Sequence, residues 1–238
     1  MNKLANLAIK GFIGTSLIDY PGCVASVLFV GGCNFRCPYC HNADLVLRPS
    51  SRPAIPTGQL LADLERRRGF VDGVVLTGGE PTLYPALAGL LRAIRAMGFA
   101  VKLDTNGSRP DVLRDWLEQG LLDYVAMDVK APRERYPEIA GREDVDVEAV
   151  AASVDVLKHC GRPHEFRTTV VPTLLHVDDV EAIARWIAGP VPYFLQQFQP
   201  NGCLDPRLER VQPYSVTELE RMATAARSYL GAVQLRGV

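Results

Sequence analysis

Three cysteines within one short segment, Cys33, Cys37 and Cys40, are the residues of this chain best suited to chemistry. The segment directly follows an apolar run from Val24 to Val30. Three thiolates on one loop can hold three irons of a four-iron iron-sulfur cluster, and the local sequence offers no fourth cysteine for the remaining iron. An iron that is left open in this way can bind and activate a substrate.

Two other kinds of metal site fit the same segment. The three cysteines together with His41 form a ligand set that suits structural zinc. The spacing of Cys37, Cys40 and His41 also satisfies the short haem-attachment pattern. A c-type haem requires export, which nothing at the start of the sequence suggests, so we set haem aside. A zinc site stays open, although it leaves the polar motifs described below unexplained.

Composition indicates a globular protein of ordinary type. The chain has 238 residues, of which 47% are apolar and 22% charged, and its formal net charge is -1. The length suits one α/β barrel as well as two smaller units. A nearly neutral balance offers no broad attraction to nucleic acid or to an anionic membrane, and the basic run Arg66 to Arg68 is typical of a solvated helix face.

The N-terminal residues indicate where in the cell the protein is located, and the distribution of the cysteines indicates what chemistry they serve. Residues 1–10 lack the apolar core of a signal peptide, and no stretch is long enough to span a bilayer. We therefore expect a cytoplasmic location and no membrane partner. In a reducing compartment, clustered cysteines indicate metal or redox chemistry better than disulfides. The isolated Cys23, Cys160 and Cys203 are expected to be buried as small apolar side chains.

Short β-branched runs alternate with longer helical patterns, which predicts strand-helix units and a parallel sheet. The expected strands are Ala25 to Val30, Gly73 to Leu76, Ala100 to Asp104, Tyr124 to Val129, Glu165 to Val171 and Tyr193 to Phe198. The expected helices are Thr57 to Arg68, Tyr84 to Met97, Pro110 to Gln119, Val147 to His159, Val177 to Ala188 and Ser215 to Leu230. Helix stops are expected at Gly69, Gly98, Gly120, Gly161, Gly189 and Gly231.

Six such units predict a partial α/β barrel, (β/α)6, because a full barrel of this kind needs eight. We expect a single domain over residues 1–238, with an N-terminal extension at 1–22, the barrel core at 23–200, and a C-terminal loop and helix at 201–238. A partial barrel has a lateral opening, which would suit a large substrate.

Polar motifs follow the first four expected strands. They are Gly31-Gly32 with the cysteine segment, Thr77-Gly78-Gly79-Glu80-Pro81, Asp104-Thr105-Asn106-Gly107 and Asp128-Val129-Lys130. The chemistry of α/β barrels gathers at the C-terminal ends of the strands, so these motifs are expected to share one catalytic rim. Each motif has a plainer explanation as a tight turn, a strand-end cap or a surface ion pair.

The spacing of the three cysteines, with an aromatic residue at Tyr39, resembles the radical S-adenosylmethionine superfamily, and Gly78-Gly79-Glu80 falls where that superfamily binds the substrate amino group. The segments Gly11 to Gly22 and Cys40-His41-Asn42 make the chain similar to activating enzymes of glycyl radical enzymes. Within that group, Thr15 to Gly22 most resembles the activating proteins of anaerobic ribonucleoside-triphosphate reductase.

The resemblance implies one [4Fe-4S] cluster held by Cys33, Cys37 and Cys40, with S-adenosylmethionine on the open iron. Reductive cleavage of that cofactor gives a 5′-deoxyadenosyl radical, which in the activating enzymes abstracts a hydrogen atom from a glycine of the partner protein. The cofactors carry the difficult chemistry, and the protein supplies placement and electronics.

The resemblance also implies roles for residues at the strand ends. Gly78, Gly79 and Glu80 would contact the methionine amino group, and Tyr39 would lie beside the adenine. Asp104, Thr105 and Asp128 correspond to positions that hold a monovalent cation in the pyruvate formate-lyase branch. Lys130 corresponds to a lysine that contacts the cofactor there.

Two further contacts are expected from the last strands. Arg167 could reach the cofactor carboxylate with its bidentate guanidinium group. At the sixth strand a histidine of the pyruvate formate-lyase branch is replaced by Asn201, so this contact departs from the family pattern.

The implied partners are a glycyl radical enzyme, for which anaerobic ribonucleoside-triphosphate reductase is the first choice, and an electron donor of flavodoxin or ferredoxin type. A pyruvate formate-lyase-like partner and a small-molecule substrate, such as a deazapurine, remain as alternatives.

Overall fold

The computed structural model describes residues 8–238 of the chain. Contacts between Cα atoms divide it into two compact units. The first unit holds Met1–Asn34, Asp44–Thr105 and Arg109–Val125, and the second holds Phe35–Ala43, Asn106–Ser108 and Ala126–Val238. The expectation of one domain over the whole chain stays a prediction. Residues 1–7, on which part of the signal-peptide argument rests, lie outside the described residues.

Within residues 8–238, eight strands form one sheet in which each strand neighbours the next along the chain, from β1 to β8. β1 runs antiparallel to β2, whereas the pairs β2 with β3, β3 with β4, β6 with β7 and β7 with β8 are parallel. The order begins at β1 and ends at β8, so the sheet is open and the expected α/β fold is confirmed. The strands are β1 (Ile9–Ser16), β2 (Ala25–Val30), β3 (Gly73–Gly78), β4 (Ala100–Thr105), β5 (Tyr124–Asp128), β6 (His164–Val170), β7 (Gly189–Gln197) and β8 (Leu230–Arg236).

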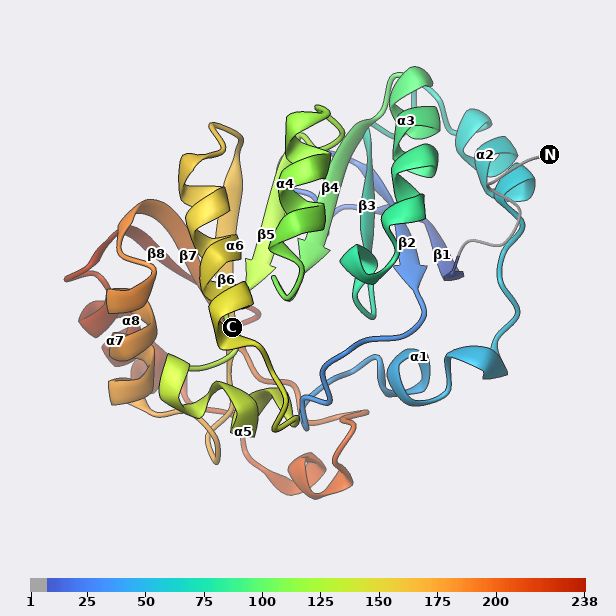
Figure 1. The fold of residues 1–238 in the computed structure, drawn as a ribbon. Coiled ribbons are helices and arrows are strands. Elements are labelled where there is room, and N and C mark those ends of the chain that lie inside the picture. Colours follow the sequence, from blue (N-terminus) through green and yellow to red (C-terminus); the bar gives the residue numbers. More distant parts are fainter. Residues whose placement is uncertain (1–7) are drawn as a thin grey trace. The chain divides into compact units, whose positions relative to one another are not determined.

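Helices follow most of the parallel strands (Figure 1). The α-helices are α1 (Ala43–Leu47), α2 (Thr57–Glu65), α3 (Ala88–Ala96), α4 (Pro110–Glu118), α5 (Tyr136–Ala140), α6 (Val147–His159), α7 (Val177–Trp186) and α8 (Val216–Ala226). Short 3-10 turns are η1 (Pro49–Ser51), η2 (Pro81–Leu83), η3 (Pro85–Leu87), η4 (Arg133–Arg135) and η5 (Pro206–Arg210). No helix within residues 8–238 is both long enough and apolar enough to cross a membrane.

The first unit is built on strands that read as continuous apolar runs. Such runs are typical of parallel strands covered on both faces, and Val27, Leu28 and Leu76 are fully buried. The register pairs Val30 of β2 with Gly78 of β3. These two strands therefore end level with each other, and the loops that follow them leave the sheet side by side.

In the second unit the strands β6 to β8 carry a core that includes Phe166, Tyr193 and Leu195, which are fully buried. α8 begins with a capping box, in which the Ser215 side chain accepts a hydrogen bond from the Glu218 backbone N–H and the Glu218 carboxylate accepts one from the Ser215 backbone N–H. α7 packs against α8, and α8 packs against β8.

Several expected boundaries are wrong. Gly231, an expected helix stop, lies within β8 instead of ending a helix. β1 lies within residues 1–22, and the expectation that these residues extend the core stays a prediction. The helix expected from Tyr84 begins at Ala88, because Pro85 starts a separate 3-10 turn. α2 ends at Glu65, so the basic run from Arg66 follows the helix instead of lining it.

Candidate functional site

The three cysteines of the opening segment take part in no disulfide. Cys37 is buried, whereas Cys33 and Cys40 are half-buried. Cys33 belongs to the first unit, and Cys37 and Cys40 belong to the second. Within residues 8–238, no group of three or more His, Cys, Asp or Glu side chains is arranged to hold a metal ion. The shared ligation of a cluster by these cysteines therefore stays a prediction.

Cys37 has the most unusual surroundings of the three. Burial raises the pKa of its thiol to about 11, and the charges of Cys40 and Asp128 act in the same direction, while Lys130 opposes them. Without a metal the thiol is thus protonated at neutral pH. Metal binding displaces such a proton, and thiolates are the ligands that iron-sulfur clusters use, so the donor set fits the implied group.

The cysteine loop is held by other loops of the second unit. The backbone N–H of Asp205 donates to the carbonyl of Pro38 at 2.8 Å. The Nε2 atom of His41 donates to the carbonyl of Gln199, also at 2.8 Å. A nitrogen that donates a hydrogen bond offers no lone pair to a metal. This contact therefore argues against His41 Nε2 as a zinc ligand in the arrangement seen here.

Tyr39, between two of the cysteines, is buried, with 5% of the residue's surface exposed. Its hydroxyl has no hydrogen-bond partner among the described residues. Burial, with a contribution from Cys37, raises the pKa of this phenol well above its usual range, so it remains a neutral donor. A buried hydroxyl normally has a partner, and a bound ligand could supply one. Its expected place beside an adenine stays a prediction.

The Gly-Gly-Glu motif after β3 packs tightly against the loop that follows β2. A Cβ atom on Gly79 would lie 1.8 Å from the carbonyl oxygen of Gly32. The backbone N–H of Glu80 donates to that same oxygen at 2.8 Å. Only glycine allows this approach of the two backbones. The motif is therefore more than a plain tight turn, because it joins two strand ends of the first unit.

Glu80 is almost completely buried and receives several hydrogen bonds. Its Oε1 atom accepts from the Thr82 hydroxyl at 2.6 Å, from the Thr82 backbone at 3.0 Å and from the Thr105 hydroxyl at 2.8 Å. These donors come from the turn η2 and from the end of β4, and they fix the direction of the carboxylate. The structure thus brings together Glu80 and Thr105, two of the expected site residues.

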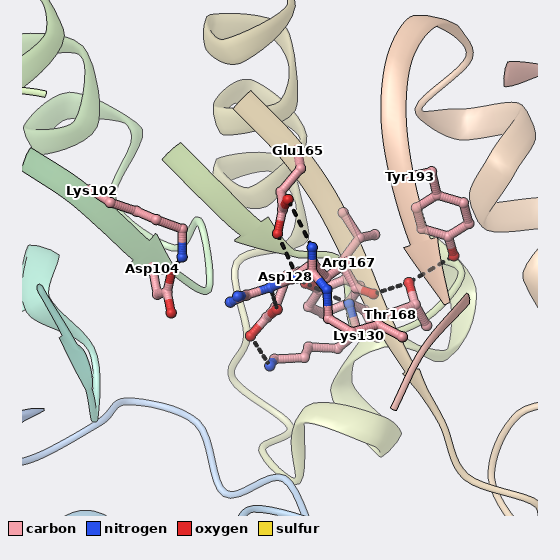
Figure 2. Close-up of polar contacts among 11 residues, drawn as sticks. Lys102, Asp104, Asp128, Lys130, Glu165, Arg167, Thr168 and Tyr193 are labelled. Carbon is pink, nitrogen blue, oxygen red and sulfur yellow. Dashed lines mark hydrogen bonds and ion pairs between the residues drawn. The ribbon is translucent and has the colours of Figure 1, made fainter. Parts of the chain in front are cut away.

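Asp104, at the end of β4, forms an ion pair with Lys102, whose Nζ lies 2.5 Å from Oδ1 (Figure 2). Lys102 is buried, with 2% of its side chain exposed. Residues two apart on a strand share a face, which explains why the two side chains meet. Sequence reasoning missed Lys102, although a lysine within an apolar strand is a usable signal.

Asp128, at the end of β5, is the centre of an ion-pair network in the second unit. Its carboxylate accepts from Lys130 Nζ and from Arg167 Nε, both at 2.8 Å (Figure 2). Burial alone would raise the pKa of this carboxyl, but Arg167 and Lys130 outweigh burial and hold the pKa well below its usual range. Burial likewise opposes the charge on Lys130, yet Asp128 raises the pKa of that lysine.

The structure therefore gives Arg167 a partner that the sequence did not predict, since it contacts Asp128 directly. A buried pair of carboxylates was expected to need a cation or a basic side chain. In each unit a basic side chain supplies that charge, and the monovalent cation stays a prediction.

The remaining expectations have mixed outcomes. Asn201 is exposed in the turn after β7, and its contact with a cofactor stays a prediction. Cys203 is buried, as expected, but Cys23 and Cys160 are only half-buried. Tyr136 was missed, although it is fully buried beside Lys130, because no local sequence pattern marks it.

A family model described as "Radical SAM superfamily" matches residues 27–187. Over 234 residues, the chain is 33% identical to a Methanocaldococcus jannaschii protein named "Putative glycyl-radical enzyme activating enzyme", covering 97% of this chain and 96% of that one. It is 27% identical over 173 residues to the pyruvate formate-lyase-activating enzyme of Streptococcus mutans, covering 68% of this chain and 64% of that protein.

Solved structures show the same fold at low sequence identity. The chain matches Streptococcus suis SuiB bound to S-adenosylmethionine with a TM-score of 0.66 and 15% identity, covering 87% of this chain and 48% of that one. It spans only about half the length of SuiB. It matches QueE from Escherichia coli with a TM-score of 0.53 and 16% identity, covering 97% and 93% of the two chains.

Members of this superfamily use a [4Fe-4S] cluster and S-adenosylmethionine, and three thiols spaced as here are the ligands such a cluster needs. The chain belongs to the radical S-adenosylmethionine superfamily and, within it, to the family of glycyl-radical enzyme activating enzymes.

Proposed function

We propose that this protein cleaves S-adenosylmethionine reductively and installs a glycyl radical on anaerobic ribonucleoside-triphosphate reductase. The observation that carries the proposal is the loop of three cysteines after β2, in a chain that shares nearly its whole length with a glycyl-radical activating relative. Cys33, Cys37 and Cys40 would hold the cluster. When bound, the cluster and its cofactor supply a 5′-deoxyadenosyl radical.

Glu80 is the residue of the first unit best arranged to bind an ammonium group. Thr82 and Thr105 fix its carboxylate, and the glycine contact between Gly79 and Gly32 fixes the backbone that carries it. A carboxylate held in one direction loses little conformational freedom when it binds a cation. We therefore assign Gly78, Gly79 and Glu80 to the methionine amino group.

In the second unit, one carboxylate and two cations surround the end of β5. Asp128, Lys130 and Arg167 together carry a net positive charge. Charge of this sign suits an anionic group, such as the carboxylate of the cofactor. Asp128 then acts as a positioning residue that orients both cations, while Tyr39 offers an unpartnered hydroxyl to the remainder of the ligand.

The choice of partner rests on the Thr15 to Gly22 segment. In the structure this segment forms the turn between β1 and β2, where the Ser16 hydroxyl donates to Asp19 at 2.5 Å and accepts from the Asp19 backbone. Leu17 and Ile18 are exposed, with 75% and 89% of their residue surfaces open to solvent. These two side chains therefore contribute little to the core. Packing does not require apolar residues at these positions, so packing does not explain why they resemble the reductase activators.

Two other functions have specific support. Similarity to pyruvate formate-lyase-activating enzymes favours a pyruvate formate-lyase-like partner. Similarity over 120 residues to a 7-carboxy-7-deazaguanine synthase of Methanopyrus kandleri, at 38% identity, favours a small-molecule substrate. That match covers 42% of this chain, whereas the activating relative covers 97%. The longer match favours the activating function.

The proposal is tested by activation without oxygen. Reconstituted protein is reduced with a flavodoxin- or ferredoxin-type donor, mixed with S-adenosylmethionine and a candidate partner, and examined by electron paramagnetic resonance. We expect a glycyl doublet with the reductase and none when the glycine of that reductase is replaced by alanine. A doublet formed only with a formate-lyase, or turnover of a deazapurine precursor without any doublet, would contradict the assignment.

A further inference from the structure

We propose that Gly141 is a positioning residue that holds the cysteine loop in place, an inference that rests on the proposed role of Cys37 and Cys40 as cluster ligands. Gly141 follows α5 and has a φ angle of 68°, in the left-handed region. Many helices end with glycine in this conformation, so the angle alone assigns no role. The contact that Gly141 makes distinguishes it from the other helix ends.

The cysteine loop and the end of α5 meet backbone to backbone. The N–H of Arg36 donates to the carbonyl of Ala140 at 2.7 Å. A Cβ atom on Gly141 would lie 2.2 Å from the carbonyl oxygen of Arg36 and 2.7 Å from its carbonyl carbon. Backbone atoms cannot rotate out of the way as a side chain can. Because Arg36 is bonded to Cys37, any residue other than glycine must displace this cysteine or the helix end.

The other end of α5 connects the same loop to β5. The ring of Tyr136 meets that of Phe35 edge to face, with centroids 6.2 Å apart. The Tyr136 hydroxyl accepts from the Lys130 backbone at 3.2 Å and lies 3.5 Å from the carbonyl of Asp128. α5 therefore fixes the cysteine loop relative to the ion-pair network at the end of β5. All of these residues belong to the second unit.

A matched control is available in the same unit. Gly161 follows α6 with a φ angle of 65°, and a Cβ atom there would meet nothing within 4 Å. Gly141→Ala and Gly161→Ala should share the same penalty for placing alanine in the left-handed region. Only Gly141→Ala also displaces a neighbouring backbone. Because asparagine tolerates this conformation, Gly141→Asn and Gly161→Asn provide a second pair if the alanine variant does not fold.

The first measurement is amide hydrogen exchange on the metal-free protein, which does not depend on the cluster. We expect the Arg36 amide to exchange roughly tenfold faster or more in the Gly141 variants, because its hydrogen bond to the Ala140 carbonyl is disturbed. In the Gly161 variants this amide should keep its wild-type rate. Equal rates in both pairs would overturn the positioning role. This result stands whether or not the protein proves to be an activating enzyme.

The second measurement links the loop to the cluster. After anaerobic reconstitution, we expect the Gly141 variants to bind less iron or to give an altered spectrum of the reduced cluster, and the Gly161 variants to match the wild type. Faster exchange at Arg36 with an unchanged cluster would overturn the link to ligation. A wild-type protein that binds no cluster would overturn the proposed function, while the exchange data would still decide whether Gly141 holds the loop.

Discussion

The hydroxyl of Thr105 can be removed with little change of shape by the substitution Thr105→Val. In the wild type it donates to Oε1 of Glu80 at 2.8 Å, within a buried site. A hydrogen bond to a charged group contributes about 1.5–3 kcal/mol. If Glu80 binds the methionine ammonium in this fixed direction, the loss should appear in cofactor affinity. Since about 1.4 kcal/mol corresponds to a tenfold change, we expect the dissociation constant for S-adenosylmethionine to rise roughly 10- to 100-fold.

The assay is calorimetric titration of S-adenosylmethionine into anaerobically reconstituted protein, with urea unfolding measured in parallel. Ser26→Ala serves as the control, because Ser26 is also buried in the first unit and donates to the carbonyl of Gly14 at 2.7 Å. The control should lose stability, about 1 kcal/mol, and keep its affinity. Thr105→Val with reduced stability but wild-type affinity would refute the assigned role of Glu80.

The further predictions concern the cysteine loop, the pair of Lys102 with Asp104, and the ion-pair network of Asp128. Cys37→Ala should prevent proper cluster assembly, and wild-type iron content with normal cofactor cleavage in this variant would contradict the prediction. In the wild-type protein, an accessible cluster should lose its visible absorbance in air. Lys102→Met leaves the carboxylate of Asp104 without its lysine and should lower the free energy of unfolding by about 3 kcal/mol. K⁺ or Na⁺ should restore part of this stability, whereas choline should not. Unchanged stability of the variant would argue against a stabilising role of the ion pair. Because the folded pKa of Asp128 lies below its usual value, its ionised form stabilises the protein fully above about pH 4 and less as the pH falls further, which denaturation at several pH values should show. Asp128→Asn should remove this part of the pH dependence, and an identical profile in that variant would contradict it.

Strands and helices could be predicted from the sequence where the pattern is local. β2 and α6 have the predicted bounds, because an apolar run or an amphipathic repeat lies between clear stop signals. β1 and β8 were missed for a physical reason. β1 contains two glycines and several polar residues among its apolar ones, so it lacks a clear strand pattern, and its strand character comes from pairing with β2. The sequence pattern predicts a helix that runs up to Leu230, the first residue of β8, since Leu230 continues the apolar pattern of α8.

For the candidate site, the sequence predicts which residues take part but not which of them contact one another. The cysteine spacing, the Gly-Gly-Glu motif and the acidic strand ends are visible in the sequence, because each is a short local pattern. The contacts of Gly79 with Gly32 and of Glu80 with Thr105 join segments far apart in the chain. The tie between Gly141 and Arg36 spans more than a hundred residues. No local pattern encodes such approaches.

The sequence by itself determined the family, the order of most strands and helices, and the three thiols that can serve as ligands, because these depend on residue type and short spacing. The tertiary structure decided how the charges are paired. It placed Lys102 on Asp104, and Lys130 with Arg167 on Asp128, because side chains of one strand face, or of neighbouring strand ends, meet only after the sheet has formed. Folding also made glycine necessary at positions 79 and 141, where one backbone lies against another.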